Sequence, residues 1–149
     1  MLFRQAELRE TKFKIKSILY MKSKIESITE VKKLVDVFYE KVRQDQVLSP
    51  IFNEIIQDQW PEHLAKMYRF WQTVLLKELT YKGAPFLPHQ KMDLEGKHFK
   101  LWLKLFNETI DENFEGETAE EARWRASKMA EMFESKINFH QENNSKPLF

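Results

Sequence analysis

The stretch from Gln59 to Phe106 constrains the fold of this chain more than any other part. It holds three of the four histidines and three of the four tryptophans. Two segments rich in large apolar side chains, QWPEHLAKMYRFW and GKHFKLWLKLF, have helical periodicity. Between them lies YKGAPFLPHQKMD, whose glycine and prolines cannot continue a long helix. The stretch therefore predicts two helices joined by a broken connection that displays one histidine, His89.

Composition limits the fold and the function classes. A chain of 149 residues suits one domain, and its three glycines and five prolines leave little turn material for a many-stranded β fold. We therefore expect an all-α protein. The formal net charge of +1 offers no cluster of cations for a nucleic-acid backbone, so we expect no nucleic-acid partner. The absence of cysteine excludes disulfides, thiolate catalysis and cysteine-ligated metal.

No segment has the pattern of a membrane span or a secretion signal. The chain contains no apolar run near the ~20 residues that a helix needs to cross a bilayer. Its only apolar cluster near the amino end, residues 18–21, is shorter than the ~7–15 residue core of a signal peptide. We expect a cytoplasmic protein with no membrane span.

The chain divides into an extension, a domain and a tail. Residues 1–24 are basic and form an extension that we expect to be helical or flexible, with Met21 as an alternative start of translation. The domain is expected at residues 25–139. Residues 140–149 are polar and predict a flexible tail.

Apolar periodicity and capping signals place five helices in the domain. Ser27 and Glu30 have capping-box spacing and open a helix with a buried stripe and Tyr39 at its edge. Further helices are expected from Ser49–Pro50, from Trp60–Pro61 to about Leu79, and over residues 95–113. Gly83 and Pro85 are expected to end the helix that starts at Trp60–Pro61. A second capping box, Thr118 with Glu121, is expected to open the last helix, with Ala122, Met129, Phe133 and Ile137 as its apolar positions.

Three polar side chains on these helices can project into one apolar cavity: Tyr39, His63 and Trp102. His89 stands apart on the broken connection. The chain has no HExxH motif, no phosphate-binding glycine loop and no nucleophile elbow, which excludes the commonest hydrolase sites. A flat apolar cofactor such as a haem would fit between two such helices, with a histidine on their connection as a ligand.

Each of these residues also has an ordinary structural interpretation. A histidine that follows a proline in a loop, such as His89, is usually a surface residue. His63 and Trp102 can be core residues, and a buried Tyr39 hydroxyl can bond to a backbone carbonyl. His98 competes with His89 as a ligand because it shares a helical face with Trp102. Spacing alone therefore indicates a helical domain with a candidate cofactor pocket.

Four segments together carry a resemblance to a known family. These are VDVFYEKVRQDQVLSPIFNEI, QWPEHLAKMYRFW, YKGAPFLPHQKMDL and FKLWLKLF, in this order. They resemble the truncated haemoglobins of the third group, and the likeness covers roughly residues 27–139. The resemblance implies a two-over-two helical sandwich around haem b (iron protoporphyrin IX), with the amino-terminal extension lying outside it.

The resemblance also implies roles for single residues. His89 falls on the proximal iron ligand, and Tyr39, His63 and Trp102 fall on the distal residues that face the bound gas. Phe52 falls on the phenylalanine packed against the porphyrin, and Met67 lies one turn beyond the distal histidine. The full set assigned to the cofactor pocket is Phe38, Phe52, Met67, Phe70, Leu94 and Phe99.

Three functions follow as hypotheses. The first is reversible binding of dioxygen, with nitric oxide and carbon monoxide as other ligands. The second is a haem enzyme for nitric oxide detoxification or peroxidase-like chemistry, which would need a separate reductase because the chain carries no flavin motif. The third is a helical interaction module without a cofactor. Tyr39, His63 and Trp102 serve either of the first two, so the sequence leaves both open.

Overall fold

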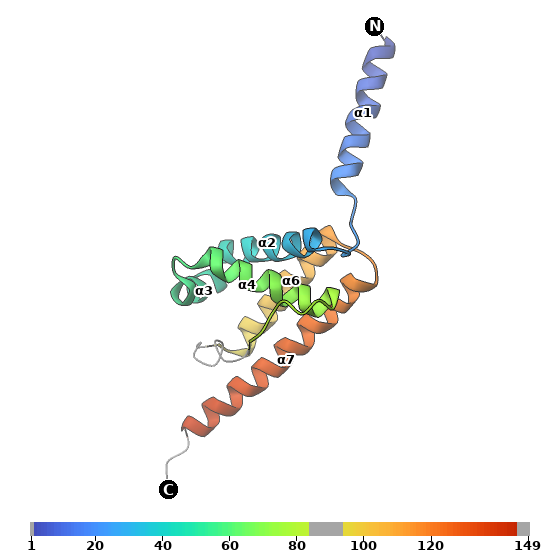
Figure 1. Cartoon of the computed structure of the whole chain (residues 1–149). Helices are drawn as coiled ribbons and strands as arrows, with labels where there is room; N and C mark the ends of the chain where they lie inside the picture. The colour runs from blue at the N-terminus through green and yellow to red at the C-terminus, as the bar shows by residue number, and fades with distance from the viewer. Residues whose placement is uncertain (1, 84–93, 146–149) are drawn as a thin grey trace.

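The computed structural model describes residues 2–83 and 94–145, and the regular structure in these residues is helical (Figure 1). The helices are α1 (Leu2–Tyr20), α2 (Ile28–Gln44), α3 (Leu48–Ile56), α4 (Trp60–Leu76), α6 (Gly96–Asn113) and α7 (Glu117–Ser145). The described part contains no strand, only an isolated bridge between Ser23 and Phe114. The expected all-α class is confirmed. Among the described helices, none is both long and apolar enough to cross a bilayer.

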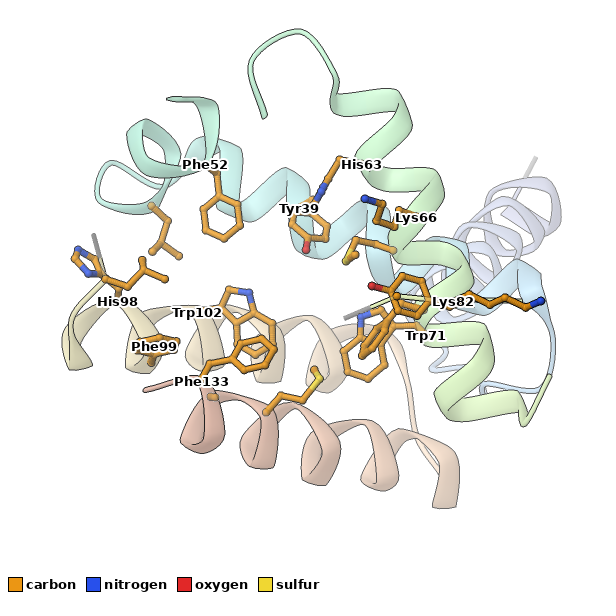
Figure 2. A pocket seen from close by; sticks show the side chains of 18 residues that line it. Tyr39, Phe52, His63, Lys66, Trp71, Lys82, His98, Phe99, Trp102 and Phe133 are labelled. Atoms are coloured by element: carbon orange, nitrogen blue, oxygen red, sulfur yellow. The ribbon is translucent and has the colours of Figure 1, made fainter. Parts of the chain in front are cut away.

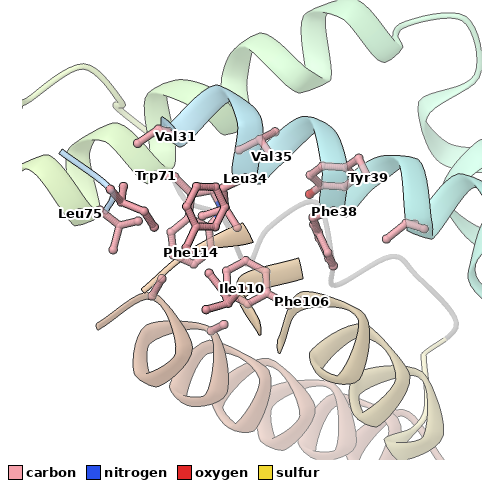
Figure 3. Packing of buried hydrophobic residues seen from close by; sticks show 14 of the residues in the cluster. Val31, Leu34, Val35, Phe38, Tyr39, Trp71, Leu75, Phe106, Ile110 and Phe114 are labelled. Atoms are coloured by element: carbon pink, nitrogen blue, oxygen red, sulfur yellow. The ribbon is translucent and has the colours of Figure 1, made fainter. Parts of the chain in front are cut away.

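Helix α2 lies at the centre of the hydrophobic core. Its predicted stripe is buried, and it consists of Val31, Leu34, Val35, Phe38 and Val42. Figure 3 shows this stripe against Phe106, Ile110 and Phe114 at the far side of the core. Such spacing buries one face of a helix because residues three and four apart lie above one another.

The helices form two layers. Helix α2 packs against α4 in one layer, α6 packs against α7 in the other, and α2 also contacts α6 across the core. Short helix α3 packs against α2 and closes one end of the first layer. The arrangement is the two-over-two sandwich that the family resemblance implies (Figure 1).

Two helix starts differ from the sequence prediction in their capping. Ser27 precedes α2 as expected, but its hydroxyl donates to the Glu30 carboxylate rather than capping a backbone N–H. Helix α3 begins at Leu48, so the predicted start at Ser49–Pro50 is wrong. The Asp45 carboxylate accepts the backbone N–H groups of residues 47 and 48, each at 2.9 Å, and so opens this helix instead.

Helix α4 is shorter than predicted. It ends at Leu76 rather than near Leu79, because Lys77 takes the left-handed conformation with φ of 61°. Gly83 lies further along and does not end the helix, and Pro85 lies outside the described residues. The chain then folds back along α4, where the Thr73 hydroxyl accepts the backbone N–H groups of residues 80 and 81.

Helix α7 extends beyond both predicted limits. It begins at Glu117, directly after Gly116 with φ of 98°, so the predicted Thr118–Glu121 capping box already lies inside the helix. The expected apolar positions Ala122, Phe133 and Ile137 are buried. The helix continues to Ser145, so residues 140–145 are helical where we expected a flexible tail.

Helix α1 projects away from the two layers (Figure 1). It shows that the extension is helical over residues 2–20, one of the two expected states. Residues 21–25 tie the extension to the domain. The Ser23 N–H donates to the Asn113 carbonyl and the Glu115 N–H donates to the Ser23 carbonyl, each at 3.0 Å, and Ile25 is buried.

Candidate functional site

A cavity lies between the two layers, and its wall is mostly apolar and aromatic (Figure 2). Its volume of about 290 Å³ is far larger than the packing defects of a close-packed interior, and near the lower end for ligand pockets. The lining includes most residues that the sequence assigned to a site: Tyr39, Phe52, His63, Met67, Phe70, Leu94, Phe99 and Trp102. The fold therefore brings together residues that are up to 63 positions apart in the chain.

Tyr39 presents its hydroxyl to this cavity from α2 (Figure 2). Rings pack edge-on around it, with centroid distances of 6.3 Å to Phe52, 5.9 Å to Trp60 and 5.0 Å to His63. Burial raises the pKa of the Tyr39 hydroxyl, because the apolar surroundings disfavour the charged phenolate. The hydroxyl is therefore a neutral hydrogen-bond donor at physiological pH.

His63 lies in the first turn of α4 and positions Tyr39. The two rings are nearly perpendicular, with an interplanar angle of 88°. The imidazole also meets the Trp60 ring edge-on at a centroid distance of 5.6 Å. Trp60 is itself fixed, because its indole N–H donates to the Asn53 side chain at 3.0 Å. These contacts hold the imidazole beside the phenol.

Trp102 faces the cavity from the other layer. Its ring stacks on Phe106 at 5.6 Å and an interplanar angle of 11°, and meets Phe38 edge-on at 5.3 Å. Figure 2 shows the indole nitrogen on the side of the ring that points toward α2. The cavity thus has a hydroxyl donor on one wall and an indole N–H donor on the opposite wall.

Phe38 does not line the cavity, which corrects its assignment to the cofactor pocket. It lies in the closed core with only 2% of its surface exposed, and its ring contacts Phe106 at 5.3 Å. Phe38 precedes Tyr39 and is therefore rotated about 100° around α2. Its contact with Trp102 supports the cavity from behind.

His98 caps α6 and is poorly suited to bind metal. Its Nδ1 accepts the backbone N–H of Glu95 at 2.9 Å, and the Glu95 side chain accepts the backbone N–H of His98 in return. In the neutral ring the proton must then sit on Nε2, which leaves no nitrogen lone pair free for an ion. This removes the competition between His98 and His89. His89 itself lies outside the described residues.

Several cavity residues were not among the predicted site residues, and three of them bear most on the chemistry of the cavity. Lys66 and Lys82 are exposed side chains that line the cavity, and so bring positive charge to its mouth. Lys66 follows His63 by three residues, and this helical spacing was a signal for the same face. Phe133 was predicted only as an apolar position of the last helix, and it contributes to the cavity wall from α7.

The chemistry of this lining suits an apolar ligand held at a few polar points. Within residues 2–83 and 94–145, no group of three His, Cys, Asp or Glu side chains could hold a metal ion by itself. The apolar walls, the two facing donors and the cationic mouth fit a large apolar ligand that carries a few polar groups.

Comparison with known proteins identifies the family of this chain. A model of the bacterial-like globin family matches residues 22–138. The chain belongs to this globin family. Globins bind small gaseous ligands at a haem, so the family implies that this chain binds haem.

Two comparisons place this globin more closely. It is 37% identical over 120 residues to the group 3 truncated hemoglobin of Campylobacter jejuni, a match that covers 76% of this chain and 94% of that protein. The crystal structure of a group III truncated hemoglobin from Campylobacter jejuni superposes with a TM-score of 0.73 at 36% identity, covering 78% and 95% of the two chains. The resemblance to the third group and the truncated globin fold are confirmed.

Proposed function

We propose that this globin binds dioxygen reversibly at a haem b, with nitric oxide and carbon monoxide as other ligands. One observation carries the proposal: Tyr39 and Trp102 present hydrogen-bond donors to one cavity from opposite layers. An apolar pocket with two facing donors favours a small ligand that bears partial negative charge. A pocket without donors would bind an uncharged diatomic ligand equally well.

The residues around the cavity fit a haem. Phe52, Met67 and Phe99 supply apolar walls for the porphyrin, and Lys66 and Lys82 at the mouth would pair with its carboxylates. When bound, the haem supplies a ferrous iron that takes diatomic ligands. By its resemblance to the proximal histidine of the family, His89 would hold this iron through a ring nitrogen.

The two donors would set the selectivity among gases. Dioxygen accepts hydrogen bonds at its outer atom because negative charge gathers there, and carbon monoxide accepts less. A hydrogen bond to a charged acceptor contributes about 1.5–3 kcal/mol, which corresponds to roughly one to two decades in affinity. His63 would act on the ligand through Tyr39, because its ring holds the phenol in place.

The first test is a visible absorption spectrum of the purified protein in its oxidised, reduced and carbon monoxide-bound forms. A strong Soret band that shifts on reduction and with carbon monoxide is expected. In His89→Ala this band should be lost or altered, because the iron would lose its protein ligand. An unchanged spectrum in the variant would remove His89 from its proposed role.

The second test concerns the donors. Tyr39→Phe and Trp102→Phe should each speed dioxygen release by about 10–100-fold in stopped-flow measurements, with a smaller change for carbon monoxide. Tyr68→Phe is the matched control, because the Tyr68 hydroxyl donates to Asp36 and does not line the main cavity. Unchanged oxygen release in both variants, with slower nitric oxide turnover instead, would favour the enzymatic function served by a separate reductase.

A further inference from the structure

Helix α1 lacks the packing that normally stabilises a helix. Every side chain from residue 3 to residue 16 is exposed. Four of them are large and apolar, with exposed fractions of 86% for Phe3, 57% for Leu8, 72% for Phe13 and 52% for Ile15. Most helices in proteins gain their stability from burying one face rather than from intrinsic helix propensity. The exposed apolar side chains of α1 therefore indicate that a partner surface outside the chain buries them.

The helix is also an addition to the globin. The family match begins at residue 22, so α1 lies wholly outside it. The hydrogen bonds of Ser23 to Asn113 and Glu115 hold the base of the extension against the end of α6. Among the described residues, none that lines the cavity precedes Tyr39, so α1 contributes no described side chain to its wall. A role other than gas binding is therefore open to it.

Charge is strongly segregated between this extension and the rest of the chain. Residues 1–24 carry seven basic and two acidic side chains, a formal net charge of +5. Because the whole chain carries +1, residues 25–149 carry −4. Such asymmetry is typical of an interaction with an anionic surface.

The two acidic residues of α1 share one side of the helix, where Lys14 and Phe3 also lie, and the opposite side carries cations without an acidic residue. Three cations, Arg9, Lys12 and Lys16, follow one another at intervals of three and four residues and so share a face. The exposed apolar residues Leu8, Ile15 and Phe13 flank them on that face. Both acidic residues, Glu7 and Glu10, lie on the opposite side of the helix. We call the side made by Leu8, Arg9, Lys12, Phe13, Ile15 and Lys16 the basic–apolar face.

We propose that α1 binds peripherally to anionic phospholipid membranes through its basic–apolar face. Lysine and arginine can keep their charged ends at lipid phosphates while their aliphatic stems lie along apolar surface. Leu8, Phe13 and Ile15, which flank these cations, would then contact the boundary between headgroups and acyl chains. A nucleic-acid backbone would attract the cations but leave these apolar residues in water, so a lipid surface fits the face better.

The experiment measures binding of the full-length protein to vesicles by co-sedimentation. Vesicles of phosphatidylcholine alone are compared with vesicles that also contain phosphatidylglycerol, at low and high salt. Binding is expected only with the anionic lipid, and it should weaken at high salt because exposed charges are screened. Equal binding to both vesicles, or no binding to either, would overturn the proposal.

Two charge-reversal pairs test the face itself. Lys12→Glu with Lys16→Glu should weaken partitioning at least about tenfold, because each cation near the lipid surface contributes independently. Arg4→Glu with Lys14→Glu makes the same change in net charge away from the centre of the face, and should weaken partitioning less than about threefold. Equal losses would show that net charge alone attracts the protein, which would contradict a specific face.

Apolar truncation separates insertion from simple electrostatic adsorption. Leu8→Ala with Phe13→Ala keeps the charge, and should still weaken partitioning at least about fivefold because apolar area at the interface is lost. Unchanged partitioning would overturn the insertion of these side chains. Circular dichroism and gas binding of every variant serve as folding controls, and neither should change, since α1 lies outside the haem pocket.

Discussion

Two adjacent residues of α2 separate two regions of this molecule. Phe38 faces the closed core, where Phe106 and Ile110 are almost wholly buried. Tyr39, the next residue, faces the cavity and aims its hydroxyl at open space. Because successive residues of a helix are rotated by about 100°, Phe38 packs in the core while Tyr39 presents a hydrogen-bond donor to the cavity. Packing in the core holds α2 in place, and the position of α2 sets the position of the Tyr39 hydroxyl.

The ends of the helices differ in their backbone conformation. Helices α2 and α6 end in residues with ordinary backbone, Asp45 with φ of −75° and Phe114 with φ of −133°. Helices α3 and α4 end in non-glycine residues with positive φ, Gln57 at 55° and Lys77 at 61°. Non-glycine residues in such conformations cost of order 1–3 kcal/mol. The strain therefore lies at the exposed carboxyl ends of α3 and α4, at residues that do not line the cavity.

The largest effect is expected from truncation in the closed core. Phe106→Ala should lower the free energy of unfolding by about 3–5 kcal/mol, because it removes a ring that contacts Phe38, Trp71 and Trp102. Phe70→Ala, in the cavity wall, is the matched control and should cost less, since part of its surroundings is already open. Denaturant unfolding of both variants measures the difference. Equal losses would mean that the two regions are equally well packed.

A pair of reciprocal substitutions on α2 sharpens the comparison further. Phe38→Tyr places a hydroxyl in the closed core without an evident partner and should destabilise the fold by about 1–3 kcal/mol. Tyr39→Phe removes a hydroxyl that faces a cavity and should change stability by less than about 1 kcal/mol. Thermal unfolding of both variants checks this. Similar costs for the two changes would contradict the assignment of Phe38 to the core and Tyr39 to the cavity.

Strain at the carboxyl end of α3 predicts a stabilising substitution. Gln57→Gly should raise the free energy of unfolding by about 1 kcal/mol, because glycine adopts positive φ without a Cβ clash. Gln59→Gly is the control, since Gln59 has φ of −94° and should gain nothing from glycine. A loss of stability in Gln57→Gly would show that this helix end is not strained.

The smallest expected effect on stability comes from the ion pair that joins the carboxyl end of α4 to α7. The Lys77 ammonium lies 2.7 Å from the Glu121 carboxylate, and its hydrogen bond lowers the pKa of that carboxyl. A lowered pKa stabilises the folded state above the unfolded pKa, and this contribution is lost as pH falls through the folded pKa. Lys77→Met should therefore cost about 0.5 kcal/mol near pH 7 and less in acid. Unfolding curves at both pH values measure it, and a larger cost in acid would contradict this sign.

Sequence periodicity was a good guide wherever a helix buries one face. The stripe from Val31 to Val42, the start at Trp60–Pro61 and the helix over residues 95–113 follow from spacing alone, because contacts three and four residues apart are local. Capping was harder to predict. Ser49 was predicted to open α3, but the Asp45 carboxylate accepts the backbone N–H groups at the start of this helix instead.

What the sequence by itself determined is the set of helices, the candidate donors Tyr39, His63 and Trp102, and the charge contrast of the extension. Only the tertiary structure decided which apolar residues close the core and which line the cavity. Phe38 and Phe52 are both apolar helix residues, and periodicity cannot tell them apart. Whether such a residue closes the core or lines the cavity depends on the helix that packs opposite it. That helix comes from a segment far away in the chain. The same reason explains why Phe133 and Lys82 joined the pocket unpredicted.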